Sequence, residues 1–125
     1  MFITRESEYA MRMVRSLADY EIKSVREICD AERIPHKWAY KILKKMEKAK
    51  IVKVFYGVYG GYQLDKDTSQ ISMLDILNMN ENTLRMNEST RELHTGKCAI
   101  SEEFISLMNV IKSELQERTM DKIVG

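Results

Sequence analysis

The 125-residue chain has few of the residue types that build disulfide frameworks, metal centres and catalytic sites. Its two cysteines, Cys29 and Cys98, are too few for a disulfide framework and do not form a CxxC pair. They favour a reducing compartment and offer no complete zinc site. Only two histidines occur, and the sequence contains no HExxH, no GxSxG and no phosphate-binding glycine loop ahead of a helix. We therefore expect no catalytic residues, no metal site and no enzyme activity.

Long apolar runs are also missing. No stretch of about eighteen consecutive apolar residues occurs, and the N-terminal MFITRESEYAMRM lacks the apolar run of a signal peptide. We therefore expect a cytoplasmic protein with no membrane partner. The chain is of one-domain size and, with 44% hydrophobic residues, can bury a core. A lone subunit of this size is marginally stable, and an oligomer would help.

The net charge of +1 averages two unlike halves of the chain. Residues 1–63 hold 13 Lys or Arg against 8 Asp or Glu, whereas residues 64–125 hold 7 against 11. Within residues 36–53, seven lysines accompany a single acid, Glu47. A cluster of that density is typical of a surface that binds polyanions, although a lysine run can also be no more than a solvated helix face.

Helical periodicity predicts three helices in the basic half. The first spans residues 4–20, the second opens at SVRE with Ser24 and Glu27 as a capping box, and the third opens at Pro35 and ends near Lys48. The apolar stripe of the third helix consists of Ala39, Ile42, Leu43 and Met46. Its basic stripe consists of Lys37, Lys41, Lys44 and Lys48, flanked by Trp38 and Tyr40. Two short helices with such an outer face are typical of a helix-turn-helix whose recognition helix enters the major groove.

A β-hairpin is predicted directly after the third helix. IVKVFY reads as a strand, GVYGG as a turn whose glycines permit positive φ, and YQL as the returning strand. A helix-turn-helix followed by such a ribbon is a winged helix. Lys53, Tyr56 and Tyr59 are candidate DNA contacts of the wing, and its glycines would let the backbone approach phosphates. Alternatively, the two tyrosines merely cover the hairpin.

These motifs, in this order and over roughly residues 1–78, resemble the bacterial winged-helix regulators typified by IscR, NsrR and CymR. The quoted segments are TRESEYAMRMVRSLA, SVREICDAERIPHKWAYKILKKMEKAKIV, YGVYGGYQL and ISMLDIL. The resemblance implies DNA contact by His36, Lys37, Trp38, Tyr40 and Lys41, and the basic stripe adds Lys44. Many members carry an Arg before GPGGGY. Here Tyr56 holds that place and Val58 and Tyr59 replace a Pro and a Gly, which suggests a different target sequence.

The acidic half predicts two further helices around a polar segment. SMLD predicts a helix capped by Ser72 with Asp75 in its first turn, and residues 79–100 form an effector or linker region with a possible helical stretch at 84–93. Residues 101–125 predict one long helix. Its apolar stripe is Phe104, Leu107, Met108, Ile111, Leu115 and Ile123. The stripe packs on the chain's own core or, as the resemblance implies, crosses to a second subunit of a two-fold homodimer. We favour the dimer, because residues 1–78 are too few to cover the stripe.

Few residues indicate which signal the protein senses. Family members with an iron–sulfur cluster carry three cysteines just before the long helix, whereas this chain has only Cys98 there, with His94 four residues earlier. The cluster is therefore disfavoured and no cofactor is expected. Three alternatives stay open for Cys98: a mixed ligand set with His94 and Glu92, a redox-sensitive thiol beside Lys97, or an ordinary loop residue. Cys29 is expected in the core.

The sequence thus predicts a mostly α fold with a small β-hairpin wing, comprising a winged helix-turn-helix (1–78) and a long C-terminal dimerisation helix (101–125). The predicted function is a sequence-specific, homodimeric repressor that binds a palindromic operator in double-stranded DNA through helix 35–48 and wing 51–64. It would respond to a redox signal or to a small-molecule effector, for which the methionine-rich residues 72–86 could line a cavity. The alternatives are a protein-interaction module without specific DNA binding, or an iron–sulfur sensor with non-cysteine ligands.

Overall fold

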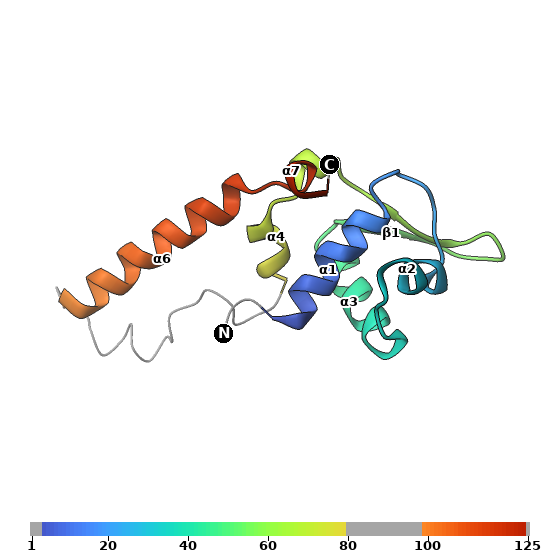
Figure 1. Cartoon of the computed structure of the whole chain (residues 1–125), viewed down its shortest axis with the longest axis horizontal. Coiled ribbons are helices and arrows are strands. Elements are labelled where there is room, and N and C mark those ends of the chain that lie inside the picture. The colour runs from blue at the N-terminus through green and yellow to red at the C-terminus, as the bar shows by residue number, and fades with distance from the viewer. Residues whose placement is uncertain (1–3, 80–98, 125) are drawn as a thin grey trace.

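The computed structural model describes residues 4–79 and 99–124 (Figure 1). Its elements are α1 (Arg5–Ser16), α2 (Val25–Glu32), α3 (His36–Lys48), β1 (Val52–Phe55), β2 (Gly61–Leu64), the 3₁₀ turn η1 (Thr68–Gln70), α4 (Met73–Leu77), α6 (Ala99–Glu117) and α7 (Met120–Val124). The first three helices and the hairpin lie at one end of the molecule, and α6 extends toward the other (Figure 1). The predicted mostly α fold with a hairpin wing is confirmed.

Local capping sets the helix starts. Ser24 accepts a hydrogen bond from the Glu27 amide (3.2 Å), while the Glu27 carboxylate accepts one from the Ser24 amide (3.2 Å), so the predicted capping box is confirmed. Ser72 and Asp75 form the same arrangement at α4. Pro35 was expected inside the first turn of α3 but precedes the helix as its N-cap, because its ψ of 133° is extended. The first helix also ends earlier than predicted, at Ser16.

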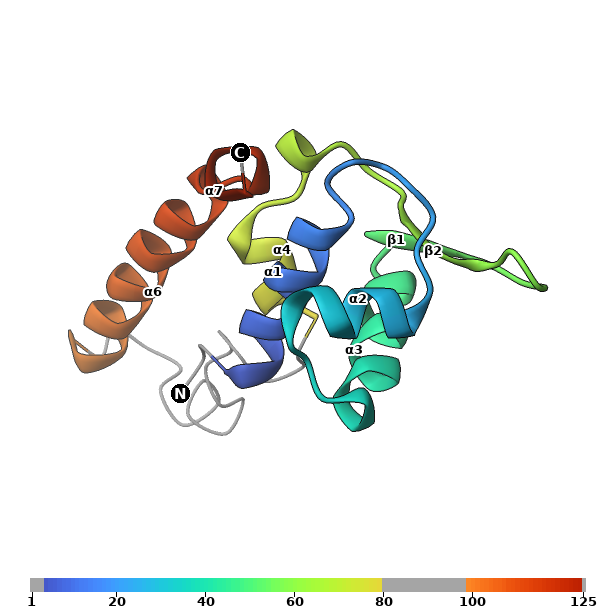
Figure 2. The same ribbon diagram turned by 45° about the vertical axis from the view of Figure 1, so that its right-hand side comes forward.

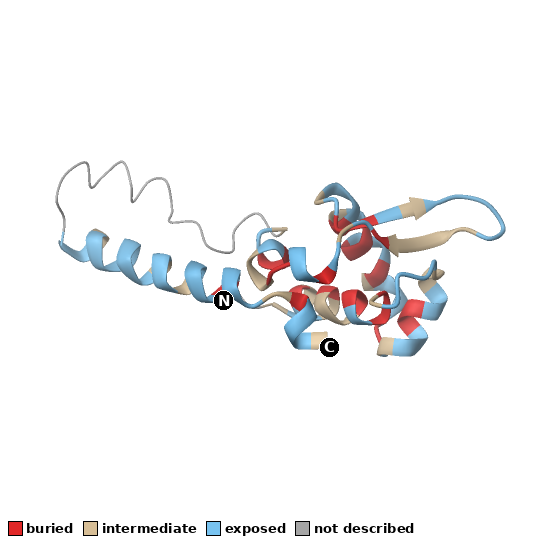
Figure 3. Cartoon of the chain, turned by 90° about the horizontal axis from the view of Figure 1, so that it is seen from above, coloured by how far each residue is buried: buried red, intermediate tan, exposed pale blue. Residues whose placement is uncertain are grey.

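One hydrophobic core joins the helices around α1. Figure 2 shows α1 at the centre, with α2 and α3 on one side and α4 and α7 on the other, and α1 contacts all four. The predicted apolar stripe of α3 is buried, and so are the core residues of α1 and of its C-cap; they are Ala39, Ile42, Leu43 and Met46 from α3, Ala10, Met13 and Val14 from α1, and Leu17 directly after it. Figure 3 shows this core in red between the helices. Burying each large aliphatic side chain contributes roughly 1.5–3 kcal/mol. This core holds α3 in place with its opposite side turned to solvent.

The wing is an antiparallel hairpin whose base is tied to the helices. Its register pairs Val52 with Leu64 and Phe55 with Gly61. The connection between α1 and α2 joins it, because the Lys23 amide donates to the Tyr62 carbonyl (2.9 Å) and the Tyr62 amide donates to the Lys23 carbonyl (2.7 Å). A Cβ on Gly61 would lie 2.4 Å from the Lys23 carbonyl oxygen, so this close approach requires glycine. The hairpin is thereby fixed relative to the helix-turn-helix.

The C-terminal segment is divided, where one continuous helix was expected. After α6 ends at Glu117, the chain bends back, because the Arg118 carbonyl accepts from the Met73 amide (2.9 Å) and the Met120 amide donates to the Ile71 carbonyl (2.7 Å). Met120 is fully buried in the main core. Leu77 and Leu115 form a second, smaller cluster that packs α4 on α6. Local periodicity could not show this bend, since its hydrogen bonds come from residues more than forty positions away along the chain.

Most of α6 is exposed (Figure 3). Only Leu115 in this helix is buried, with Met108 and Ile111 half-buried beside α4. Over residues 4–79 and 99–124, no helix combines the length and the apolar character needed to span a membrane. The predicted helical stretch 84–93 and the candidate sensing residues His94 and Cys98 lie outside the described residues.

Candidate nucleic-acid interface

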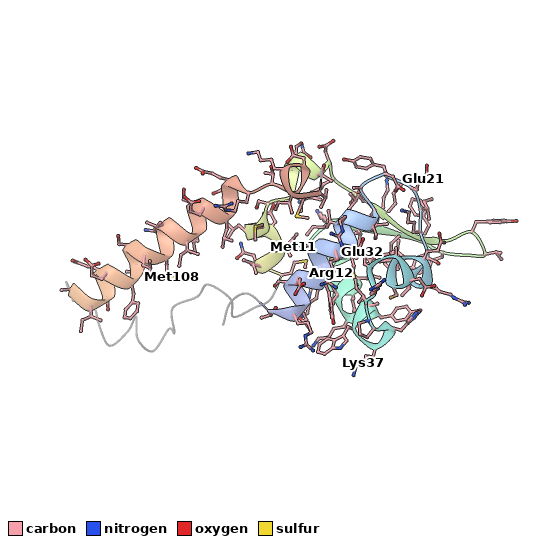
Figure 4. The ribbon with its side chains drawn as sticks, viewed as in Figure 1. Met11, Arg12, Glu21, Glu32, Lys37 and Met108 are labelled. Atoms are coloured by element: carbon pink, nitrogen blue, oxygen red, sulfur yellow. The ribbon has the colours of Figure 1, made fainter. Side chains whose placement is uncertain are left out.

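Helix α3 presents two chemically distinct faces. Its apolar face is buried against α1 and α2, whereas His36, Lys37, Tyr40, Lys41, Lys44 and Lys48 are exposed. Trp38 is half-buried at the edge of the core. Lys37 lies at the N-terminal end of α3, at the lower edge of the molecule in Figure 4. The structure therefore brings all the predicted residues of this helix onto one exposed cationic and aromatic surface or to its edge.

A carboxylate on α1 pairs with two of the lysines. The Nζ atoms of Lys41 and Lys45 lie 2.8 and 2.9 Å from the two carboxylate oxygens of Glu6. Hydrogen bonds from Lys41 and then Lys45 hold the pKa of the Glu6 carboxyl below its ordinary value. The ammonium of Lys41 also lies 5.8 Å from the centre of the Trp38 ring. Lys41 therefore ties α3 to α1 as well as facing solvent.

Lys37, Lys44 and Lys48 form no ion pair within residues 4–79 and 99–124. Their charges are not neutralised by a neighbouring described carboxylate, so they contribute positive potential to the exposed face of α3. Such cations attract and neutralise phosphates of a nucleic acid. Replacing one of these three lysines therefore tests binding to a polyanion without also removing an ion pair.

The wing extends away from the helices (Figures 1 and 2). Lys53 is exposed on β1, with its ammonium 5.7 Å from the centre of the Phe55 ring. Tyr56 and Tyr59 are 88% and 94% exposed, so they do not cover the hairpin. The predicted alternative of a structural role for these two side chains is therefore wrong.

Sequence reasoning missed Glu6 and Tyr62. Glu6 lies 39 positions before Lys45, and no local spacing pairs residues so far apart. Tyr62 lies on β2, packs against the main core and pairs with Lys23. Burial raises the pKa of its phenol, and repulsion from Glu47, Tyr40 and Tyr56 adds to the rise. The sequence offered one signal for this role of Glu6, namely its position as an acidic residue on the polar side of the first helix.

A helix-turn-helix whose second helix is exposed, basic and aromatic, followed directly along the chain by a hairpin, defines a winged-helix DNA-binding protein. The chain matches the Rrf2 family, described as "Iron-dependent Transcriptional regulator", over residues 3–125. It belongs to the Rrf2 family of transcriptional regulators.

Relatives and solved structures agree with this assignment. The chain is 37% identical over 87 residues to a helix-turn-helix regulator of Synechocystis sp. (strain ATCC 27184 / PCC 6803 / Kazusa), and this match covers 67% of the chain but only 59% of that relative. It is 25% identical over 99 residues to the transcriptional regulator NsrR of Shouchella clausii, covering 76% of the chain and 66% of NsrR.

Two solved structures have the same fold. CymR, the global cysteine regulator of B. subtilis, superimposes with a TM-score of 0.78 and 22% identity, covering 98% of this chain and 95% of CymR. T. potens IscR gives a TM-score of 0.76 and 18% identity, covering 98% of this chain and 85% of IscR. The resemblance noted in the sequence is confirmed.

The family description raises the question of iron, and the donor set does not fit a thiolate-bound cluster. Within the described residues, no group of three or more His, Cys, Asp or Glu side chains is placed to hold a metal ion. Cys29 is 2% exposed in the core, and burial raises the pKa of its thiol. Cys98 is then the one remaining thiol in the sequence. Iron–sulfur clusters are usually held by four cysteine thiolates, which this chain cannot supply.

Proposed function

We propose that the protein is a cytoplasmic, homodimeric repressor that binds a palindromic operator in double-stranded DNA through α3 and the wing. The observation that carries this proposal is the exposed face of α3, where lysines and aromatic side chains lie opposite a buried apolar face. A helix of this kind fits the major groove, with its cations on phosphates and its polar side chains on base edges. Membership of a family of transcriptional regulators supports the same reading.

The exposed side of α6 supports the dimer. Five of its large apolar side chains are 45–69% exposed; they are Ile100, Phe104, Ile105, Leu107 and Val110. Ile100, Phe104 and Leu107 lie at i, i+4 and i+7 and so share one face of α6, and an exposed apolar face of this kind is typical of an association site. A second copy would cover it, and its two-fold axis would present two α3 helices to a palindrome.

For the signal, we propose a redox or small-molecule effector and no thiolate-bound cluster. Cys98 is the one cysteine in the segment 79–100 just before α6, and Cys29 is buried in the core, so a cluster would need ligands other than thiolates. Protein purified without oxygen is expected to be colourless and to lack stoichiometric iron and sulfide. Visible absorbance with stoichiometric iron would favour a cluster with His94 or carboxylate ligands instead.

The test of DNA binding is selection of bound duplexes from a random pool by the full chain, followed by affinity measurements against salt concentration. We expect an enriched palindrome and an affinity that falls steeply with salt, since each neutralised phosphate adds about 0.9 to the logarithmic slope. Lys44→Ala should lower the slope by about 0.9, whereas Lys112→Ala, the same charge change on α6, should leave it unaltered. No enrichment, or a flat salt response, would favour the protein-interaction module.

A further inference from the structure

The tip of the wing is apolar, exposed and uncharged. Between Lys53 and Asp65 the sequence holds no charged residue. The Gly60 amide donates to the Gly57 carbonyl (3.0 Å), which closes a turn with Val58 and Tyr59 at its centre. Both central side chains are 94% exposed. Exposing large apolar side chains to water is unfavourable, and a hairpin needs none at its apex.

The tip is also held in place. A Cβ on Gly60 would lie 2.2 Å from the Phe55 carbonyl oxygen, and one on Gly61 would lie 2.4 Å from that of Lys23. The two strands pair from Val52 to Phe55, and hydrogen bonds from Lys23 fix the second strand to the helices. The wing therefore presents Val58 and Tyr59 at a defined position relative to α3.

The tip continues the surface that is proposed to bind DNA. The first strand of the wing, β1, packs directly on α3, and Tyr40 on α3 and Tyr56 just after β1 are both exposed. Lys53, at the base of the wing, adds a cation beside Phe55. Aromatic side chains thus extend from the outer face of α3 along the wing, with cations at the helix and at the wing base and none at the tip.

An uncharged apolar tip suits bases better than phosphates. It cannot neutralise a phosphate, whereas apolar side chains can enter the minor groove and unstack a base step, which kinks the duplex. Pyrimidine–purine steps open most easily. We propose that Val58 and Tyr59 form a wedge that opens a base step outside the site read by α3, so that the wing selects deformable DNA. This inference rests on the proposed DNA-binding function.

The first test compares DNA bending by three forms of the full chain: wild type, the double variant Val58→Ser with Tyr59→Ser, and Lys44→Ala. The probe is an enriched duplex labelled at both ends for energy transfer. The double variant should lose the bend and about tenfold in affinity at an unchanged salt slope, since contact with one base by an aromatic side chain is worth roughly 5- to 150-fold. Lys44→Ala should lower the salt slope by about 0.9 and keep the bend.

The second test uses DNA that is already weakened at the step beside the wing. A single mismatch there should raise the affinity of the wild type several-fold, because less stacking remains to be broken, and should not affect the double variant. Both replaced side chains are almost fully exposed, so the thermal stability of the double variant should match that of the wild type.

Three outcomes would overturn the wedge. Bending retained by a double variant that still binds would show that the tip opens no base step, while leaving the proposed DNA recognition by α3 intact. Equal response of both proteins to the mismatch would show that no step is opened. A wild type that enriches no duplex would refute the proposed function itself, and the wedge with it.

Discussion

At the scale of single residues, Glu6 shows how one side chain serves both the fold and the interface. Its side chain is 15% exposed and meets the ammonium groups of Lys41 and Lys45 from α3. Charged groups that are partly withdrawn from water interact more strongly than exposed pairs, which contribute about 0–1 kcal/mol. The pair therefore orients α3 on α1 while it occupies cations that would otherwise face phosphates.

Glu6→Gln tests this role through pH. The lysines lower the pKa of the Glu6 carboxyl in the folded state. Its contribution to stability is consequently present above the unfolded-state pKa of about 4.3, and it is lost as the pH falls through the lower folded-state pKa. Near pH 7 the variant should be less stable than the wild type by about 1 kcal/mol, and by about pH 3 the difference should vanish. Urea unfolding at both pH values measures it.

Glu8→Gln is the matched control, because Glu8 lies on the same helix and pairs with Arg12 at 59% exposure of its side chain. An exposed pair of this type should change the free energy of unfolding by less than about 0.5 kcal/mol. If Glu6→Gln destabilised the protein equally at both pH values, the ion pairs would not be the cause.

At the scale of elements, the wing depends on a close approach between its second strand and the connection before α2. Gly61 has φ 156° and faces the Lys23 carbonyl, whereas Gly57 has φ 106° with nothing within 4 Å of an added Cβ. Comparing alanine substitutions at the two glycines therefore separates the destabilisation caused by steric contact from that caused by backbone strain. Gly60 and Gly61 are required by the chain's own backbone, whereas the space beside Gly57 is open.

Gly61→Ala should consequently destabilise the protein more than Gly57→Ala. Replacing a glycine with positive φ costs about 1 kcal/mol or more through backbone strain, and only the first variant adds a collision with the Lys23 carbonyl. Thermal unfolding followed by circular dichroism compares the two. Equal losses of stability would mean that the Lys23 contact relaxes without cost.

At the scale of the whole molecule, α6 lies largely outside the core that the winged part forms. Contacts with α4 through Leu77 and Leu115 cover one side of it, and the bend at Arg118 returns the chain to α1 and η1 through α7. The apolar residues on the remaining side of α6 are exposed. This division leaves α6 anchored at its C-terminal end, with the apolar face that is proposed to bind a second copy exposed.

Phe104→Glu together with Leu107→Glu should convert the proposed dimer to a monomer. These side chains are 57% and 56% exposed, so their replacement should leave the winged core folded while placing charges in the apolar interface. Light scattering after size exclusion measures the mass. Ser106→Glu with Asn109→Glu adds the same charge on the opposite side of α6 and should leave the mass unaltered. A wild type that is itself monomeric would refute the dimer.

Sequence reasoning succeeded where the interactions are short in range. The predicted capping box at Ser24 and the predicted cap at Ser72 join residues three positions apart, and the two faces of α3 follow from the repeat of the helix itself. It failed at the bend after Glu117, at the ion pairs of Glu6 and at the link between Lys23 and Tyr62. Each of these interactions joins residues that are distant along the chain, and no local sequence pattern indicates which distant residue a side chain or backbone group will contact.

The class of fold, the basic outer face of the recognition helix and the lack of a full set of cysteine ligands could all be predicted without the structure, because periodicity, charge and composition are local or additive properties. Tertiary structure alone decided which lysines are paired, where the wing is fixed and which side of α6 remains uncovered. These three features depend on how α1 packs against four other helices. The distances between residues that are far apart along the chain are defined only once it has folded.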